Sequence, residues 1–141
     1  MKIVCILKIV IILNKISYGR LFKECTLAIY EGLYNNFSEL NNSENYYRFI
    51  GVYKDLLQDH EWKIVGNRPF KNDEEAWAPP SVVVDAITKK GSLYYKGQIT
   101  PCTYDECKDL EVVAAWDRHH VVDMLMGDTK WDDSIRKPID K

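Results

Sequence analysis

The sequence predicts an all-α protein, a small bundle of four to five helices around one central helix. The central helix is predicted over residues 104–126, because Thr103 and Glu106 form a capping box before it and Gly127 can end it. Apolar residues lie on nearly all sides of this stretch at helical spacing, which is typical of a buried helix. Two further stretches, residues 20–35 and 43–60, carry apolar residues along one helical face.

Residues 1–19 are predicted to be a secretory signal peptide. Met1 and Lys2 give a short positive start, an apolar run follows, and Ser17 and Gly19 supply the small residues of a cleavage site. Cleavage after Gly19 leaves 122 of the 141 residues, with 21 acidic against 16 basic side chains, so the formal net charge changes from −2 to −5. We therefore expect a secreted protein with no membrane association after cleavage and no nucleic-acid partner.

The remainder is predicted to be one helical domain over residues 20–127 and a flexible tail over residues 128–141 that Trp131 anchors. An Asn-rich loop separates the first two helices, and a longer irregular stretch ends at Pro79 and Pro80.

One segment of this domain is ambiguous. Residues 81–91 are predicted as a short helix that Ser81 caps and Gly91 ends, although three consecutive valines favour a strand. A strand pair formed by residues 62–65 and 93–99 is the alternative, and it would make the fold α+β.

Three cysteines follow the predicted cleavage position, and we expect two of them to form one structural disulfide because the secretory route is oxidising. A bridge from Cys25 to Cys102 or Cys107 closes a longer loop than Cys102–Cys107 and is slightly favoured for that reason. The third thiol could link two chains into a dimer. The spacing is wrong for a Cys-x-x-Cys redox pair, and no zinc partners are evident.

The sequence also contains candidates for modification and for a binding surface. Asn36 and Asn41 each begin an Asn-x-Ser glycosylation signal in the Asn-rich loop. Tyrosine is abundant, and several tyrosines do not fit the expected helical core faces. These tyrosines form a possible binding surface, since tyrosine is favoured at interfaces: Tyr47, Tyr94, Tyr95 and Tyr104.

The expected central helix holds an acid and histidine cluster of Asp117, His119, His120 and Asp123. At one-turn spacing these residues could bind a metal ion or catalyse proton transfer. However, the sequence lacks a His-Glu-x-x-His motif, a nucleophile elbow and a glycine-rich phosphate loop. Helix-surface ion pairs and one Asp117–His120 pair are therefore favoured, and we expect neither enzymatic activity nor a cofactor.

These observations favour a secreted, disulfide-stabilised helical protein that binds another protein, such as a protein of a host. The spacing of Cys102, Tyr104 and Cys107 resembles a Cys…Tyr…Cys pattern in secreted salivary effector proteins of sap-feeding insects, which ranks an effector-like role among the alternatives. The first alternative is a carrier of a small apolar ligand, because the core is rich in aromatic residues and methionine. The second is a metal-dependent enzyme that uses His119, His120 and Asp123.

Overall fold

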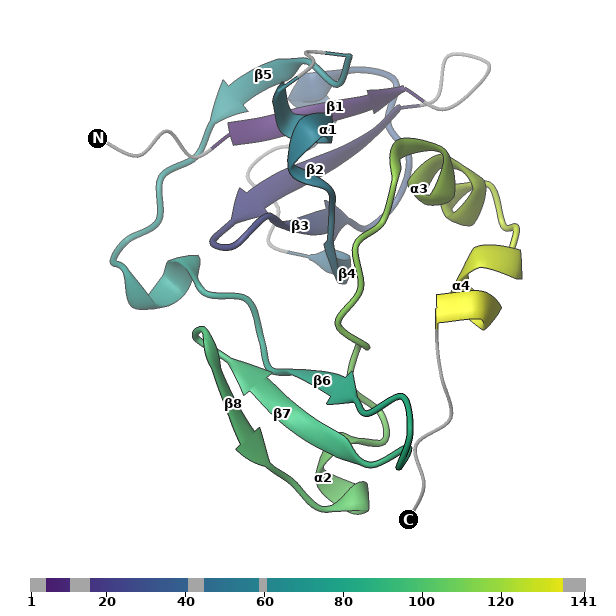
Figure 1. Ribbon diagram of the computed structural model, residues 1–141. Coiled ribbons are helices and arrows are strands. Elements are labelled where there is room, and N and C mark those ends of the chain that lie inside the picture. The colour runs from purple at the N-terminus through teal and green to yellow at the C-terminus, as the bar shows by residue number, and fades with distance from the viewer. Residues whose placement is uncertain (1–4, 11–15, 41–44, 59–60, 136–141) are drawn as a thin grey trace.

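The protein folds into two antiparallel β-sheets flanked by short helices, in a computed structural model that describes residues 5–10, 16–40, 45–58 and 61–135 (Figure 1). The first sheet has five strands in the order β4-β3-β2-β1-β5, and the second has three in the order β6-β7-β8. The strands are β1 (Cys5–Val10), β2 (Ile16–Phe22), β3 (Thr26–Tyr30), β4 (Tyr46–Gly51), β5 (Ile64–Asn67), β6 (Ser81–Val84), β7 (Gly91–Tyr95) and β8 (Gln98–Pro101). The all-α prediction is therefore wrong.

The helices of the described residues are all short. They are α1 (Lys54–Gln58), α2 (Tyr104–Cys107), α3 (Arg118–Leu125) and α4 (Lys130–Ile135), with 3-10 turns η1 (Phe37–Leu40) and η2 (Glu74–Ala76). Helix α4 falls within the expected flexible tail, whose residues 136–141 lie outside the described part. No helix in the described ranges combines the length and the apolar character that crossing a membrane requires.

The segment 20–35 shows why helical spacing misled the prediction. Glu24 and Cys25 take positive φ angles of 59° and 53°, which turn the chain back so that β3 pairs with β2. Four of the five residues of β3 are buried, because apolar side chains point to both faces of the sheet. Apolar residues at helical spacing therefore arise here from a strand that is buried on both sides.

Two other predicted helices also contain strands. Within residues 43–60, β4 precedes the short helix α1, and the valines of residues 81–91 form β6. The expected extended character of residues 93–99 is confirmed by β7 and β8. The alternative pairing of this stretch with residues 62–65 is wrong, because Ile64 lies opposite Leu7 of β1 in the other sheet.

The five-stranded sheet carries a hydrophobic cluster on each side. The larger cluster packs α1, α3 and Trp116 against the sheet, as the position of both helices in Figure 1 shows. Its buried members are Ile9, Leu27, Ile29, Ile50, Val52, Leu56, Trp62, Trp116, Val121 and Met124. The smaller cluster comprises Ile6, Tyr18, Tyr30 and Leu40.

Part of the expected signal peptide lies in this sheet. Strand β1 pairs with both β2 and β5, and the expected cleavage position follows Gly19 in the middle of β2. Gly19 lies opposite Ile29, and a Cβ atom there would come within 2.6 Å of the Leu27 side chain. A glycine at this position therefore allows close packing against β3. Whether the leader is cleaved stays a prediction.

The two sheets are joined by an extended segment, residues 109–116, that we call the strap. At one end, Val82 of β6 donates to the Glu111 carbonyl at 2.9 Å, and Val113 donates to the Val82 carbonyl at 2.8 Å. At the other end, Trp116 donates to the Gly51 carbonyl at 2.8 Å. The predicted helix over residues 104–126 is therefore wrong in its middle, because the strap pairs with both sheets.

Candidate functional site

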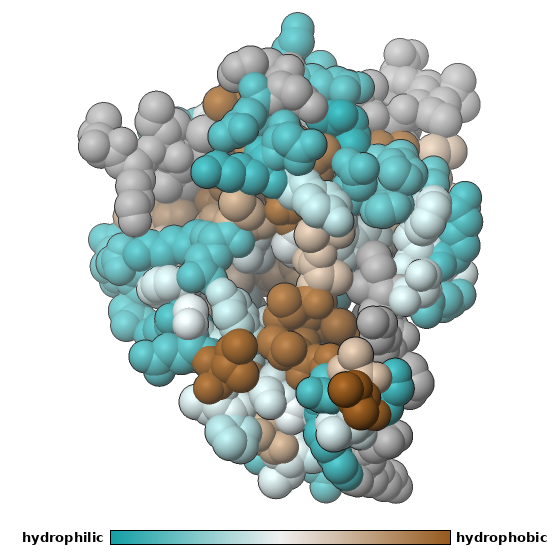
Figure 2. Space-filling model, in the orientation of Figure 1, coloured by the Kyte–Doolittle hydropathy of each residue, from teal (hydrophilic) through white to brown (hydrophobic). Residues whose placement is uncertain are grey.

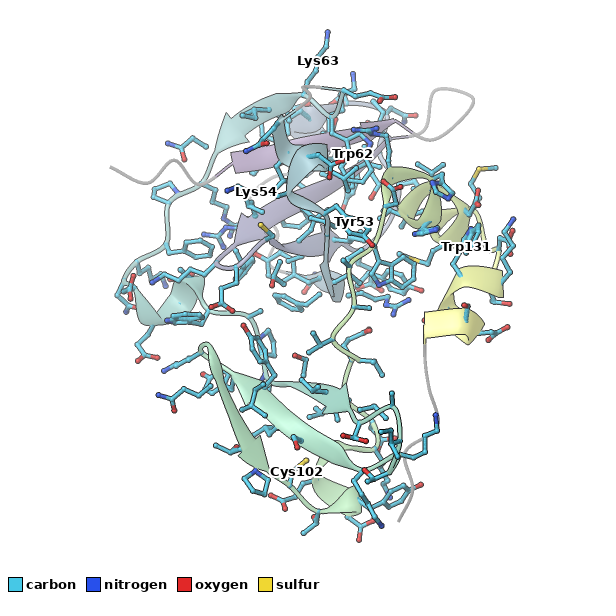
Figure 3. All side chains as sticks on the ribbon, viewed as in Figure 1. Tyr53, Lys54, Trp62, Lys63, Cys102 and Trp131 are labelled. Atoms are coloured by element: carbon cyan, nitrogen blue, oxygen red, sulfur yellow. The ribbon has the colours of Figure 1, made fainter. Side chains whose placement is uncertain are left out.

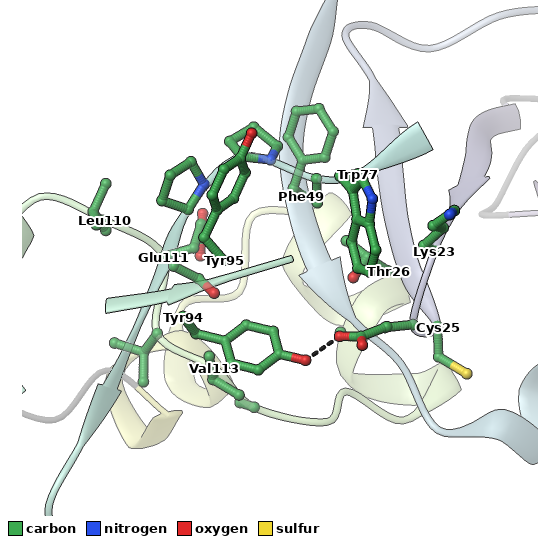
Figure 4. A pocket seen from close by; sticks show the side chains of 18 of the residues that line it. Lys23, Cys25, Thr26, Phe49, Trp77, Tyr94, Tyr95, Leu110, Glu111 and Val113 are labelled. Carbon is green, nitrogen blue, oxygen red and sulfur yellow. Dashed lines mark hydrogen bonds between the residues drawn. The ribbon is translucent and has the colours of Figure 1, made fainter. Parts of the chain in front are cut away.

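A cavity of about 600 Å³ opens between the two sheets (Figure 4). Its walls come from five stretches that are distant in sequence: the β2–β3 turn, the end of β4, residues 77–81, the end of β7 with its turn, and the strap. Its volume lies within the range of about 300–1,000 Å³ that is typical of small-molecule sites. The tertiary arrangement of the sheets therefore creates a site that no continuous motif encodes.

Aromatic side chains dominate the walls of this cavity. Figure 4 shows the rings of Phe49, Trp77, Tyr94 and Tyr95 around the same space. Pro79, Pro80 and the apolar strap residues complete the lining. Flat rings and prolines expose apolar area with few rotatable bonds, so a ligand can bind here at a low cost in side-chain entropy.

Two lysines lie at the edge of the cavity. Lys23 donates to the carboxylate of Asp73 at 2.5 Å, and its ammonium lies 4.7 Å from the centre of the Trp77 ring. Lys96 pairs with Glu74 and lies 5.1 Å from the centre of the Tyr95 ring. Hydrogen bonding to Glu74 raises the pKa of Lys96, so its ammonium stays charged at neutral pH. Positive charge therefore borders an aromatic surface.

The β2–β3 turn joins the β7–β8 hairpin across this opening. The Tyr94 hydroxyl donates to the carboxylate of Glu24 (Figure 4), and this bond raises the pKa of Tyr94 more than burial does. Glu24 and Cys25 occupy the left-handed region, which costs about 1–2 kcal/mol for a residue with a Cβ. Strained residues of this kind cluster at functional sites.

The strap wall is held in place by an ion pair with β4. Arg48 binds both carboxylate oxygens of Glu111, at 2.8 and 2.7 Å, and also contacts Asp132 of α4 at 3.2 Å. The Arg48 side chain is only 7% exposed. These bonds raise the pKa of Arg48 even though burial acts in the opposite direction. One buried guanidinium therefore connects the first sheet, the cavity wall and the last helix.

The predicted disulfide is not present, since Cys25, Cys102 and Cys107 are all free thiols. Cys25 lies in the β2–β3 turn at the cavity, whereas Cys102 follows β8 at the end opposite the β7–β8 turn (Figure 3). The Cys107 thiol donates to the Thr103 carbonyl at 3.2 Å. Burial, followed by a hydrogen bond with Cys107, raises the pKa of Cys102 to about 11. The structure is therefore less compatible with a disulfide from Cys25 than with one between Cys102 and Cys107.

The remaining predicted residues are spread over the surface. Asn36 is exposed and accepts a hydrogen bond from Ser38, while Asn41 lies outside the described residues. The tyrosines separate: Tyr94 and Tyr95 line the cavity, but Tyr47 is exposed on β4 and Tyr104 begins α2. Two of the four tyrosines proposed from the sequence therefore belong to the candidate site.

The residues of the acid and histidine cluster cap helix α3 and connect it to α4. Asp117 caps the helix, and its backbone amide donates to Nδ1 of His120 at 3.1 Å, which completes a capping box. Trp131 of α4 packs between this helix and α3 (Figure 3), where its ring is tilted against that of His120 and its indole N–H donates to Asp123 at 2.7 Å. Across the described ranges, no group of three or more His, Cys, Asp or Glu side chains is arranged to bind a metal ion.

Because His120 in this capping box can be protonated, we expect the free energy of unfolding to decrease in mild acid. Burial, and secondarily the charge of His119, lower the pKa of His120 below its usual value of 6.5. The folded state thus binds fewer protons than the unfolded state, so the His120 contribution is complete above pH 6.5 and is lost as the pH falls through the folded pKa. Protonation also removes the Nδ1 acceptor that Asp117 uses.

We expect the free energy of unfolding, measured with urea, to decrease between pH 7.5 and 5.0. His120→Gln should flatten this dependence, because glutamine at this position accepts the same capping bond without titrating. His119→Gln is the matched control and should retain most of the decrease, because burial of His120 is the larger cause of its lowered pKa and the charge of His119 is the smaller one. If the free energy of unfolding falls equally with pH in wild type and in His120→Gln, His120 is not the cause of the decrease.

Comparison with protein-family models, with curated proteins and with solved structures yields no match. The class of protein is therefore defined by its own geometry: a two-sheet β protein with an aromatic cavity between the sheets. Sequence reasoning missed Trp77 and the strap as parts of this site. The available signal was the surplus of aromatic residues, and Tyr94 and Tyr95 of the predicted binding surface line this cavity.

Proposed function

We propose that the protein binds a small, largely apolar ligand in the cavity between its two sheets. The observation that most directly supports this proposal is the cavity itself, which has a volume of about 600 Å³ and four aromatic rings in its walls. Small-molecule sites are usually concave and mostly apolar, with a few polar groups that set orientation. Here Lys23, Lys96 and the Glu24–Tyr94 pair supply such groups at the edge.

Filling the cavity should abolish this binding. N-phenyl-1-naphthylamine, a neutral fluorescent probe, should bind wild type saturably, with one molecule per chain. Ala115→Phe places a ring among the cavity walls and should weaken binding about tenfold or more, a loss of about 1.4 kcal/mol. Ala86→Phe, at an exposed position in the β6–β7 turn outside the cavity lining, is the matched control and should bind like wild type.

Two outcomes would contradict the proposal: no saturable binding by wild type, or equal loss in both alanine variants. Near-ultraviolet circular dichroism checks that each variant keeps its tertiary structure. A series of neutral probes with one, two and four fused rings would separate a wrong ligand size from an absent site.

A second candidate function, binding another protein, is supported by exposed apolar residues of the three-stranded sheet and its turns. Ile87 in the β6–β7 turn is 91% exposed and Ile99 of β8 is 62% exposed, and Figure 2 shows hydrophobic side chains at the surface of the lower half of the molecule. Strand β8 ends the sheet order, so an extended segment of a partner could add to it. Failure of all apolar probes would leave this candidate as the better explanation.

A further inference from the structure

We infer that the ligand carries one carboxylate beside its apolar body, and that Lys23 and Lys96 bind this group at the edge of the cavity. The inference rests on the proposed function, because it names the ligand class for the same site.

The two ammonium groups come from different sheets but converge on one place. Lys23 belongs to the β2–β3 turn of the first sheet and Lys96 to the β7–β8 turn of the second, and both line the cavity. Their acidic partners, Asp73 and Glu74, are consecutive residues. Both ammonium groups are thus held by neighbouring carboxylates at the edge of one aromatic cavity.

These ion pairs leave room for a further anion. The Lys23 and Lys96 side chains are 17% and 31% exposed, whereas those of Asp73 and Glu74 are 77% and 72% exposed. Ion pairs with such exposed partners contribute little to stability. Each ammonium has three N–H donors, so each lysine can donate to a ligand carboxylate while it keeps its acidic partner. Low exposure next to aromatic rings strengthens such a bond.

The acidic residues of the lining do not offer an equivalent site for a cation. Glu24 already accepts from the Tyr94 hydroxyl, and both oxygens of Glu111 are bound by Arg48. Asp109 is exposed. The faces of Trp77 and Tyr95, where an organic cation would stack, already have the lysine ammonium groups beside them. A cationic ligand would therefore meet like charge at the edge of the cavity.

Three probes of matched shape test this charge preference by isothermal titration calorimetry: 2-naphthylacetate, 2-naphthylacetamide and 2-(2-naphthyl)ethylamine. We expect the carboxylate to bind wild type about tenfold more tightly than the amide, as for a charge-assisted bond, and the amine to bind most weakly. The double variant Lys23→Gln/Lys96→Gln should lose this tenfold preference and should bind the amide within about twofold of wild type.

Lys63→Gln is the matched control, since Lys63 is exposed on the opposite side of the first sheet from the cavity and points outward (Figure 3). It should bind all three probes like wild type. Lys23→Arg/Lys96→Arg should retain the preference for the carboxylate.

If the three probes bind equally, or if the amine binds best, the inference is overturned while cavity binding stands. If none of them binds and Ala115→Phe has no effect on the neutral probe, the proposed function fails as well.

Discussion

Removal of residues 1–19 is expected to abolish the folded state. The deletion removes β1 and the first four residues of β2, so β5 loses the strand that connects it to the sheet. It also removes the buried Ile9 of the larger hydrophobic cluster and the buried Ile6 and Tyr18 of the smaller one. Burying one such side chain contributes about 1.5–3 kcal/mol, so the combined loss approaches the whole stability of about 5–15 kcal/mol.

Two-dimensional NMR of residues 20–141 against the full chain measures this effect. We expect the dispersed amide signals of the full chain to collapse in the shortened chain. A synthetic peptide of residues 1–19, added in trans, should restore them if the missing strand is the cause. Dispersed signals from residues 20–141 alone would show that this segment is dispensable for folding, as a cleaved leader must be.

Arg48→Met is expected to lower the free energy of unfolding by about 3 kcal/mol and to weaken ligand binding. The variant keeps much of the side-chain volume but leaves the carboxylates of Glu111 and Asp132 without their shared guanidinium. Removing one partner of a buried ion pair is costly because the other charge stays partly desolvated. The strap also loses its side-chain ion pair with β4, although the backbone bond from Trp116 to Gly51 remains, so the cavity wall around Glu111 should become less well ordered.

Urea unfolding and probe titration of the same preparation test both effects. Arg118→Met is the matched control, because Arg118 pairs at 2.8 Å with a Glu61 side chain that is 65% exposed. Such surface pairs contribute about 0–1 kcal/mol, so this variant should lose far less stability. In a double-mutant cycle, Arg48→Met with Glu111→Met should recover part of the loss. Equal effects of the two arginine variants would contradict a special role for Arg48.

The helix ends around the strap show how far local sequence could predict the structure. The capping box of Thr103 and Glu106 is confirmed, and Gly127 takes a φ of 91° just after α3. The predicted pairing of the Asp117 carboxylate with His120 is replaced by a second capping box, in which the Asp117 backbone amide donates to His120 at the start of α3. Each of these features depends on residues within four positions of one another, so the sequence contains all of the information that is needed.

The middle of the same segment shows the limit of this reasoning. Residues 109–116 have a helical apolar pattern, yet Val113 pairs with Val82, and Glu111 pairs with Arg48. These partners lie 31 and 63 positions away in the chain. Local propensity amounts to tenths of a kcal/mol per residue, whereas leaving a buried backbone group or a buried charge without its partner costs about 1–5 kcal/mol, so the tertiary contacts decide.

By itself, the sequence determined the N-cap of α2, the glycine that follows α3, the extended character of residues 93–99 and the packing of Trp131. Only the tertiary structure decided that the expected helices over residues 20–35 and 81–91 are strands and that a cavity separates two sheets. The physical reason is that strand pairing and cavity walls join residues that are far apart in the chain. Such contacts leave no periodicity in any one segment.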